Sequence, residues 1–466
     1  MNVKKLVCSI ISLSLLVNCG IAALPVSASA VDTDTEIYVS PDGNDSNSGS
    51  SESPFKTLER AKAEVRVHNS NMSGNIIVNI ASGVYYMDNT LEFTQADSGT
   101  NGFSVIYRGI TDENGNSPIV SGGVDISDNW ELYDESLNIY KHENIDWSFR
   151  QLYTNNDRAI RARVPNLENK ETGGPYFRAS GGDGSYPLFI GTNNEYAQKA
   201  GNDAEIIWNS SWSQFRARIE SYNSSTGRVT FKAPDNSFAW NHHTQGDTPF
   251  YLENSLAYLD SEGEWYLDKD TSTLYYKPRE GEIMNKTEII APKLETIIDI
   301  NGTDENKTEN ITFDGIQFLH SNWLAPDSYG YCIVQGGFRY QSEGGKDNSA
   351  IRGSARYDAP KSMVQLRHTK NISLINSEFS FSGSWGIMGY EDTENTFIDH
   401  NVFTKNAGGG VTMGMAGREW DDQTENEQPR TYTDMDGQSR YDTITNNYID
   451  HVACEYQDMV GIGAML

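Results

Sequence analysis

Four side chains in the C-terminal half of the sequence have the types and spacing that acid–base chemistry requires. Asp399 directly precedes His400, and an Asp beside a His can set each other's protonation state. Glu455 and Asp458 share the loop before Gly461. Two carboxyl groups that flank one bond, at about 5–5.5 Å or about 6.5–9.5 Å from each other, can hydrolyse a glycosidic bond. We treat these four as candidate catalytic residues. The alternative explanations are that His400 is a corner residue of the fold and that the acids lie in solvated turns.

A second group of side chains could hold a sugar. Aromatic rings offer flat faces to sugar C–H groups, and guanidinium groups donate hydrogen bonds to hydroxyls. The candidates for substrate binding are His320, Trp323, Arg339, Arg367, Trp385 and Tyr390. Packing of the aromatic rings onto the body of the protein is the alternative explanation.

Metal and nucleotide chemistry find little support in the sequence. Asp434-Met-Asp-Gly437 matches part of a calcium loop, but the other ligands of that pattern are absent. The sequence has no phosphate-binding Gly loop, no Gly-x-Ser-x-Gly motif and no paired cysteines at metal-ligand spacing. We therefore expect no cofactor, with calcium as the weak alternative.

Repeats between Lys370 and Leu466 indicate how these side chains would be positioned. Three segments align so that Phe379, Phe403 and Ile449 coincide, and each copy is followed by a glycine and a β-branched residue. Short alternating repeats with Asn at their corners, separated by insertions of variable length, predict a right-handed parallel β-helix. In such a helix stacked asparagines can bond along the axis, and equivalent positions of successive coils stand about 4.8 Å apart. Acids distant in sequence can then form a pair.

The sequence predicts four regions. Residues 1–30 form a signal peptide, 31–129 an N-terminal cap with the first coils, 130–285 an all-β insertion domain (a sandwich or barrel), and 286–466 the remaining coils. Leu58, Ala61 and Val65 would share one face of a helix that covers the open edge of the first coil. Residues 264–268 and 273–277 are expected to form a β-hairpin.

The first residues have the three parts of an export signal. Lys4 and Lys5 precede an apolar run over residues 6–16, and Ala28-Ser-Ala30 is a small-residue cleavage site. The run is too short to span a membrane. Cys19 raises a lipoprotein alternative, which Asn18 disfavours because a small residue is expected there. We expect a secreted protein without a membrane anchor after cleavage, in which Cys332 and Cys454 either pair or stay free.

The charge of the chain limits its partners. The formal net charge is −29, and the acids are dispersed over the sequence. Such a field repels phosphates and other polyanions, so it argues against a nucleic-acid partner and leaves neutral and cationic substrates open. With 25 Tyr, 17 Phe and 9 Trp, the chain has enough apolar material for two domains.

Several motifs in a fixed order resemble one known family over nearly all of the mature chain. They are Tyr38–Asp45 with Pro54–Thr57, Arg150–Tyr153 with Arg158–Arg163, Gly263–Asp268 with Tyr275–Glu282, Asn322–Leu324, and Glu455-Tyr456 with Val460–Ile462. These motifs are similar to secreted bacterial β-helix proteins of glycoside hydrolase family 141, and the middle segment is similar to the insertion domain of that family.

This resemblance implies a protein that hydrolyses plant cell-wall polysaccharide of the xylan or pectin side-chain type, as a xylanase or an α-L-fucosidase, through a carboxylate acid/base pair. It also implies coils beyond Leu466, with one or both catalytic carboxylates in them. Separately, we expect a monomer. A polysaccharide lyase on the same fold and a non-catalytic glycan-binding β-helix are the alternatives. Reducing ends without unsaturated products would indicate hydrolysis. Unsaturated products would indicate a lyase, and binding without any product would indicate a glycan-binding module.

Overall fold

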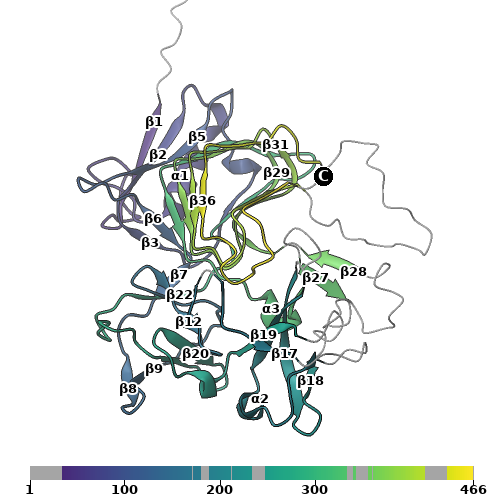
Figure 1. Cartoon of the computed structure of the whole chain (residues 1–466). Helices are drawn as coiled ribbons and strands as arrows, with labels where there is room; N and C mark the ends of the chain where they lie inside the picture. The colour runs from purple at the N-terminus through teal and green to yellow at the C-terminus, as the bar shows by residue number, and fades with distance from the viewer. Residues whose placement is uncertain are drawn as a thin grey trace, which may run out of the picture.

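The computed structural model describes residues 34–170, 172–179, 188–210, 213–232, 247–332, 339–342, 355–358, 360–414 and 438–464. Figure 1 shows two parts, a stack of coils that carries both the first and the last strands, and a second β-rich domain below it. The chain leaves the stack after β6 and re-enters it at β23. We call the part from β7 to β22 the inserted domain.

Parallel sheets run along the stack. The longer sheet follows β1 (Thr35–Val39), β2 (Ile76–Ala81), β5 (Val105–Ile110), β24 (Thr308–Asp314), β29 (Ser362–Ile375), β31 (Trp385–Glu394), β34 (Val411–Met413) and β37 (Ile462–Ala464), and it also holds β4 (Leu91–Phe93), β23 (Ile298–Asn301), β32 (Phe397–Asp399) and β35 (Thr443–Thr445). The shorter sheet follows β3 (Val84–Tyr86), β6 (Ile119–Ser121), β25 (Gln317–Leu319), β30 (Glu378–Ser380), β33 (Val402–Thr404) and β36 (Tyr448–Asp450). Every coil-to-coil pairing in them is parallel, so the predicted parallel β-helix architecture is confirmed.

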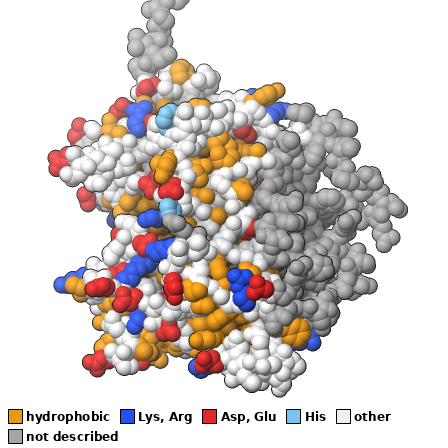
Figure 2. Space-filling view, in the orientation of Figure 1, with side chains coloured by type: hydrophobic (Ala, Val, Ile, Leu, Met, Phe, Trp, Pro, Cys, Tyr) orange, Lys and Arg blue, Asp and Glu red, His pale blue; other side chains and the backbone are white. Residues whose placement is uncertain are grey.

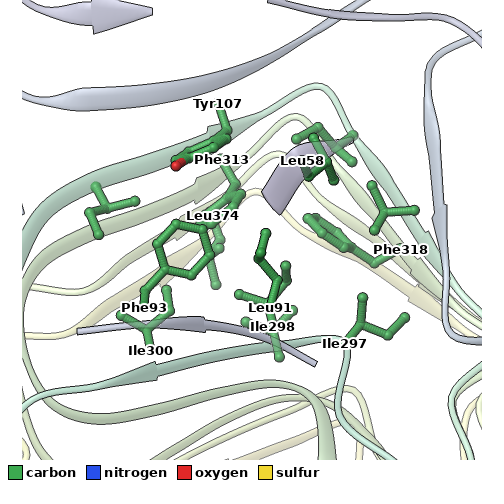
Figure 3. Close-up of a cluster of buried hydrophobic side chains, with 14 of the residues drawn as sticks. Leu58, Leu91, Phe93, Tyr107, Ile297, Ile298, Ile300, Phe313, Phe318 and Leu374 are labelled. Carbon is green, nitrogen blue, oxygen red and sulfur yellow. The ribbon is translucent and has the colours of Figure 1, made fainter. Parts of the chain in front are cut away.

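The interior of the stack consists of columns of like side chains. Phe318, Phe379, Phe403 and Ile449 pair in register from coil to coil. The rings of Phe318 and Phe379 are stacked at 5.2 Å, and those of Phe379 and Phe403 at 5.1 Å. Figure 3 shows how inward side chains from several coils meet in one core. The predicted alignment of the repeats is therefore correct, and each coil depends on its neighbours to bury its inward face.

Asparagines at the corners bond along the axis of the stack, as the repeats predict. Asn371 donates to Asn310 at 2.9 Å, and Asn395 donates to Asn371 at 3.3 Å. Asn401 donates to Asn447 at 3.0 Å. Asn310, Asn371 and Asn395 have φ between 53° and 58°, a left-handed conformation that Asn tolerates better than most residues. The corners thus explain why Asn recurs at this position of the repeat.

The hydrogen bonds between stacked asparagines lead to a prediction about stability at Asn401. This side chain is buried; it accepts a hydrogen bond from the Ser377 amide at 2.9 Å and donates to the Leu374 carbonyl at 2.8 Å. Asn401→Ala leaves buried backbone groups unpaired, so we expect it to lower the free energy of unfolding by about 2 kcal/mol. Urea denaturation measures this change. The matched control is Asn306→Ala, at an exposed position without a left-handed φ, with an expected cost below about 0.5 kcal/mol; equal costs would contradict the explanation.

A helix closes the first coil, as predicted. Helix α1 (Leu58–His68) begins after Thr57, whose hydroxyl accepts a hydrogen bond from the Arg60 amide at 3.2 Å. Leu58, Ala61 and Val65 are buried against the coil core. Short 3-10 helices follow at Asn69–Asn71 and Gln95–Asp97. The helix covers apolar surface that the first coil cannot bury against a preceding neighbour.

The inserted domain consists mainly of antiparallel strands. Its strands are β7 (Gly123–Asp125), β8 (Glu131–Asp134), β9 (Ile139–Glu143), β10 (Tyr153–Thr154), β11 (Asp157–Arg158), β12 (Ile160–Arg161), β13 (Arg163–Val164), β14 (Phe177–Arg178), β15 (Leu188–Phe189), β16 (Glu205–Ser210), β17 (Ser213–Asn223), β18 (Arg228–Phe231), β19 (Pro249–Glu253), β20 (Glu264–Asp268), β21 (Thr273–Tyr276) and β22 (Ile289–Pro292). Helix α2 (Glu195–Lys199) and a 3-10 helix (Leu256–Tyr258) complete it. The predicted hairpin is present as β20 and β21.

Two sheets of the inserted domain share one core. One sheet has the order β12-β20-β21-β9-β8, and the other runs from β13 through β19, β16, β17 and β18 to β15. Ile139 of the first sheet packs in the same cluster as Ile206, Trp208 and Phe215 of the second. This face-to-face packing is the sandwich alternative of the sequence prediction.

Glu264 makes the stability of the inserted domain depend on pH. Its carboxyl is fully buried and accepts hydrogen bonds from the amides of Arg163, Asp260 and Ser261 at 3.1–3.2 Å. Burial outweighs these bonds and raises the pKa of Glu264 from 4.5 to about 8. The folded protein therefore keeps a proton that the unfolded chain releases at lower pH, and stability must fall as pH rises from 4.5 toward 8. Glu264→Gln should remove this fall, measured as the slope of unfolding free energy against pH; an unchanged slope would contradict it.

The segment after β25 joins the two domains. Helix α3 (Ala325–Tyr329) is followed by β26 (Tyr331–Cys332), which pairs with β17 of the inserted domain, and β27 (Arg339–Ser342) pairs with β28 (Ala355–Asp358). Among the described residues, no helix is both long and apolar enough to cross a membrane.

Candidate active site

Two carboxylates stand side by side on the outer face of the longer parallel sheet. Glu92 lies in the middle of β4 and Asp299 in the middle of β23, and these two residues are register partners in adjacent parallel strands. Their neighbours in each strand are buried, so both acids point outward. Adjacent strands lie about 4.8 Å apart, which is close to the separation of about 5–5.5 Å between the carboxyl groups of retaining glycosidases.

The surroundings of Asp299 differ from those of Glu92. Glu92 is exposed, whereas Asp299 is partly buried and, among the described residues, its Oδ1 has no hydrogen-bond partner. Burial raises the pKa of Asp299, the charge of Glu92 adds to this effect, and Lys361 and Arg367 oppose it. Two neighbouring carboxyl groups in different surroundings are the arrangement that acid catalysis with two carboxyl groups requires.

A groove of about 420 Å³ lies one strand away from Asp299, and neither Asp299 nor Glu92 is among the residues that line it. Gln365, the register partner of Asp299 on β29, lies in its floor. We call it the sheet groove; it is lined by Glu295, Trp323, Leu324, Ala325, Ser328, Pro360, Lys361, Gln365, Arg367, Met388 and Tyr390. The guanidinium carbon of Arg367 lies 4.3 Å from the ring centroid of Tyr390, which fixes both side chains in the wall. The groove thus combines aromatic surface, hydrogen-bond donors and a nearby carboxylate pair.

Three of the candidate binding residues meet in the sheet groove. Trp323, Arg367 and Tyr390 all line it. Trp323 is only 1% exposed, and its ring packs at 4.8 Å against Tyr456 and at 5.9 Å against Tyr331. It therefore contributes an edge to the groove and most of its surface to the core.

The other three candidate binding residues lie elsewhere. His320 is buried beneath β6, where its Nδ1 lies 3.0 Å from the Ser121 hydroxyl, and burial lowers its pKa to about 3. Trp385 is fully buried, and an added Cβ on Gly409 would meet its ring at 2.1 Å. The backbone of Arg339 pairs with Asp358 in the two-stranded sheet of β27 and β28, and its side chain is outside the described part of the structure.

Asp399 and His400 form a pair on a corner of the coils. His400 Nδ1 lies 2.5 Å from Asp399 Oδ2, and Asn446 donates to Asp399 Oδ1 at 2.9 Å. His400 has φ of 54°, the same left-handed corner conformation as Asn446. Its side chain is 60% exposed, and neither residue lines the sheet groove. The geometry agrees with the alternative explanation, in which His400 is a corner residue.

Glu455 and Asp458 lie where the last described coil meets the inserted domain. Glu455 accepts a hydrogen bond from Gln151 at 2.9 Å and pairs with Arg158 at 2.6 Å. Burial would raise the pKa of Glu455, but the charges of Arg158 and Arg216 and this hydrogen bond outweigh burial and lower it. Glu455 is thus an ionised carboxylate held between domains, and it lines a separate cavity of about 340 Å³.

Asp458 has the opposite environment. It accepts hydrogen bonds from the Tyr331 hydroxyl at 2.5 Å and from the Gln214 amide at 3.0 Å, and burial raises its pKa. These two contacts tie the last described coil to β17 and β26. Asp458 does not line the cavity that Glu455 borders.

One cluster of ligand-type side chains lies on a far turn of the stack. Asp304, His368 and Asp392 have ligand atoms within 4.8 Å of one another. Lys307 donates to Asp392 at 2.8 Å, so an ammonium group already provides positive charge there. The Asp434–Gly437 segment lies outside the described residues. Cys454 is a free cysteine.

Sequence reasoning missed the pair of Glu92 and Asp299. In Leu91-Glu-Phe93 and Ile298-Asp-Ile300 the alternation of apolar and acidic residues does indicate outward-facing acids. However, the two strands are separated in sequence by the whole inserted domain, and only their register brings the acids together. Alternation marks the direction of a side chain but not its neighbour on the next strand.

Comparisons with known proteins bear on the domain composition and the fold. Residues 137–279 match the family model of the GH141 insertion domain, so the predicted similarity of the middle segment is confirmed. A solved structure described as a glycoside hydrolase superposes with a TM-score of 0.79 at 24% identity, and the match covers 92% of this chain and 75% of that chain. At this identity the likeness shows a shared fold.

A second solved structure is too dissimilar to support a conclusion about this chain. It is described as "The complex structure of XylC with xylose", and it matches with a TM-score of 0.43 at 12% identity over 92% of this chain and 56% of that chain. No curated protein matches the chain.

Proposed function

We propose that the protein is a glycoside hydrolase and that Asp299 and Glu92 are its carboxylate pair. The match of residues 137–279 to the GH141 insertion domain and the fold shared with a glycoside hydrolase support the reaction class. The observation that carries the assignment is the register of Glu92 with Asp299 on adjacent outward-facing strands. This arrangement supports the proposal, because two such carboxyl groups could both reach one glycosidic bond.

We propose the roles of the two acids from their environments. Asp299, whose pKa burial raises, would protonate the leaving-group oxygen as the general acid. Glu92, which is exposed, attacks the anomeric carbon as the nucleophile. Water then enters in the second half of the reaction, and Asp299 removes its proton. The short strand spacing favours this retaining course over an inverting one, which needs room for a water molecule between the acids.

The sheet groove would hold the sugar next to the bond that is cut. Tyr390 offers an aromatic face, and Gln365, Lys361 and Arg367 offer donors to hydroxyl groups on the side of Asp299. The resemblance to the GH141 family supports a plant cell-wall polysaccharide as the substrate, of the xylan or pectin side-chain type. We further propose that the protein is exported through the signal peptide at residues 1–30 and that it acts as a monomer.

Product analysis tests this function. The purified chain is incubated with arabinoxylan, rhamnogalacturonan and polygalacturonate, and reducing ends, unsaturated products and binding are measured. New reducing ends without ultraviolet-absorbing unsaturated products support hydrolysis. Unsaturated products would instead indicate a lyase, and binding without any product a glycan-binding module. The anomer released first, followed by NMR, tests the retaining course.

A further inference from the structure

A cavity between the two domains has a charge opposite to that of the chain. It has a volume of about 340 Å³, which is within the range of small-molecule sites. We call it the junction pocket; its charged lining residues are Asp157, Arg158, Arg161, Arg163, Lys170, Arg216, Glu253, Lys405 and Glu455. Six of these described side chains are cationic and three are anionic, in a chain whose formal net charge is −29. Figure 2 shows Lys and Arg side chains among Asp and Glu on the face toward the viewer, where the two domains meet.

Most of the cations in the junction pocket are neutralised by neighbours. Arg158 pairs with Glu455 at 2.6 Å and Arg216 with Glu253 at 2.6 Å. In addition, Lys170 pairs with Asp157 at 2.7 Å, and Arg161 pairs with Glu205 at 3.1 Å and with Glu253 at 3.3 Å. These pairs use the three acids of the lining and also Glu205 outside it, and they leave two cations of the lining without an acidic partner among the described residues.

Arg163 and Lys405 are those two cations. Arg163 is 5% exposed and donates to the carbonyls of Pro165 and Pro175, and its guanidinium carbon lies 3.7 Å from the ring centroid of Tyr251. Lys405 donates to the Asn156 carbonyl at 2.9 Å. Within the described part of the chain, neither forms an ion pair with a carboxylate. A buried guanidinium without a counter-charge is costly, and an anion in the pocket would offset that cost.

We propose that the junction pocket binds the carboxylate of an acidic sugar, with Arg163 and Lys405 as its counter-charges. The lining also includes Ala159, Ile160, Leu167 and the ring of Tyr251, which suit the C–H face of a sugar ring and which a free phosphate ion would not use. The inference rests on the proposed function, because the proposed ligand is an acidic sugar unit of a branched glycan substrate. It concerns one carboxylate in a pocket, so it is compatible with the repulsion of polyanions by the whole chain.

Matched ligands test the charge requirement. Methyl galacturonide and its neutral methyl ester share one ring and differ in a single charge, and both are titrated calorimetrically into the full chain. A charge-assisted hydrogen bond contributes about 1.5–3 kcal/mol, so we expect the acid to bind at least about tenfold more tightly than the ester, and less tightly as NaCl is added. Equal affinities for acid and ester would overturn the proposal, as would tighter binding of inorganic phosphate than of the acid.

Variants test the assigned cations. Lys405→Gln should weaken binding of the acid at least about tenfold, whereas Lys405→Arg should retain it. The matched control is Lys199→Gln on α2, whose side chain is 61% exposed and remote from the lining, and it should leave affinity unchanged. Lys170→Gln removes a second positive charge from the lining. The Lys170 side chain is 63% exposed, so the protein should still fold, and the variant should also bind the acid more weakly. Unchanged affinity in both Lys405→Gln and Lys170→Gln would overturn the proposal.

The outcomes separate this inference from the proposed hydrolysis. Binding is measured both in the wild-type chain and in Asp299→Asn, in which hydrolysis of polysaccharide is expected to be at least about 100-fold slower. Binding of the acid in both proteins supports the junction pocket whether or not the wild-type chain cleaves polysaccharide. Hydrolysis without binding of the acid would overturn the pocket alone.

Discussion

Asp299→Asn is expected to lower kcat/KM on polysaccharide by at least about 100-fold, because it removes the proton that the leaving oxygen needs. The same variant should keep most of its kcat/KM on aryl glycosides with strongly acidic phenol leaving groups, because these depart without protonation and kcat/KM does not include the second half of the reaction, in which Asp299 acts as the base. Initial rates on both kinds of substrate measure the difference. An equal loss on the two substrates would show that Asp299 does not act as the general acid.

The pH profile gives an independent readout of the same group. Because burial raises the pKa of Asp299, its proton is retained to higher pH than in an ordinary aspartic acid, and activity should fall on the alkaline side as that proton is lost. The alkaline limb should be absent from the residual activity of Asp299→Asn. An unchanged limb in the variant would assign it to another group.

Two matched variants complete the experiment. Glu92→Gln should reduce activity on polysaccharide and on aryl glycosides alike, since the nucleophile is needed whatever the leaving group. Asp399→Asn replaces a carboxylate on a corner of the same stack, outside the sheet groove, and should leave kcat/KM nearly unchanged. A large loss in Asp399→Asn would return the catalytic role to the Asp399–His400 pair.

The architecture could be predicted because it is local and periodic. Phe379, Phe403 and Ile449 recur with the same flanking residues, and stacking of coils is the arrangement that buries all of them. The face of α1 follows in the same way from the spacing of Leu58 and Val65. Both are cases in which one short segment contains the whole signal.

The candidate site depends on information that no short segment contains. Glu92 and Asp299 become neighbours only because the chain returns to the stack in a particular register after the inserted domain. Conversely, Trp323 and Trp385 have the residue type of a sugar platform, yet both are buried, and packing accounts for their positions. Residue type alone does not distinguish an aromatic side chain of the core from one of a binding surface.

The net charge is similarly uninformative about local sites. Dispersed acids give the chain its formal charge of −29, but Arg158, Arg161 and Arg163 gather on one wall of the junction pocket. They do so because β11, β12 and β13 follow one another closely along the edge of the inserted domain. A global count predicts long-range repulsion of polyanions, whereas binding of a single anion depends on the few charges around it.

Loss of the Arg150 side chain is expected to destabilise the folded protein by about 3–5 kcal/mol, the cost of leaving buried charges without their partner. Arg150 is 2% exposed and binds Glu205 through two hydrogen bonds of 2.8 and 2.9 Å, and it also contacts Asp327 of α3. It thereby links β16 of the inserted domain to the segment that returns from the coils. Burial would raise the pKa of Glu205, but the charges of Arg150 and Arg161 outweigh it and lower that pKa.

Urea denaturation of Arg150→Ala measures this cost, and two further variants identify its origin. Lys199→Ala breaks an exposed pair with Glu195 and should cost less than about 1 kcal/mol, because solvent screens that pair. The double variant Arg150→Met with Glu205→Leu removes both charges together and should recover most of the loss, since apolar side chains of similar volume need no counter-charge. If the double variant is as unstable as Arg150→Ala, the loss comes from packing volume at the domain junction, and the buried ion pair contributes little to holding the inserted domain on the coils.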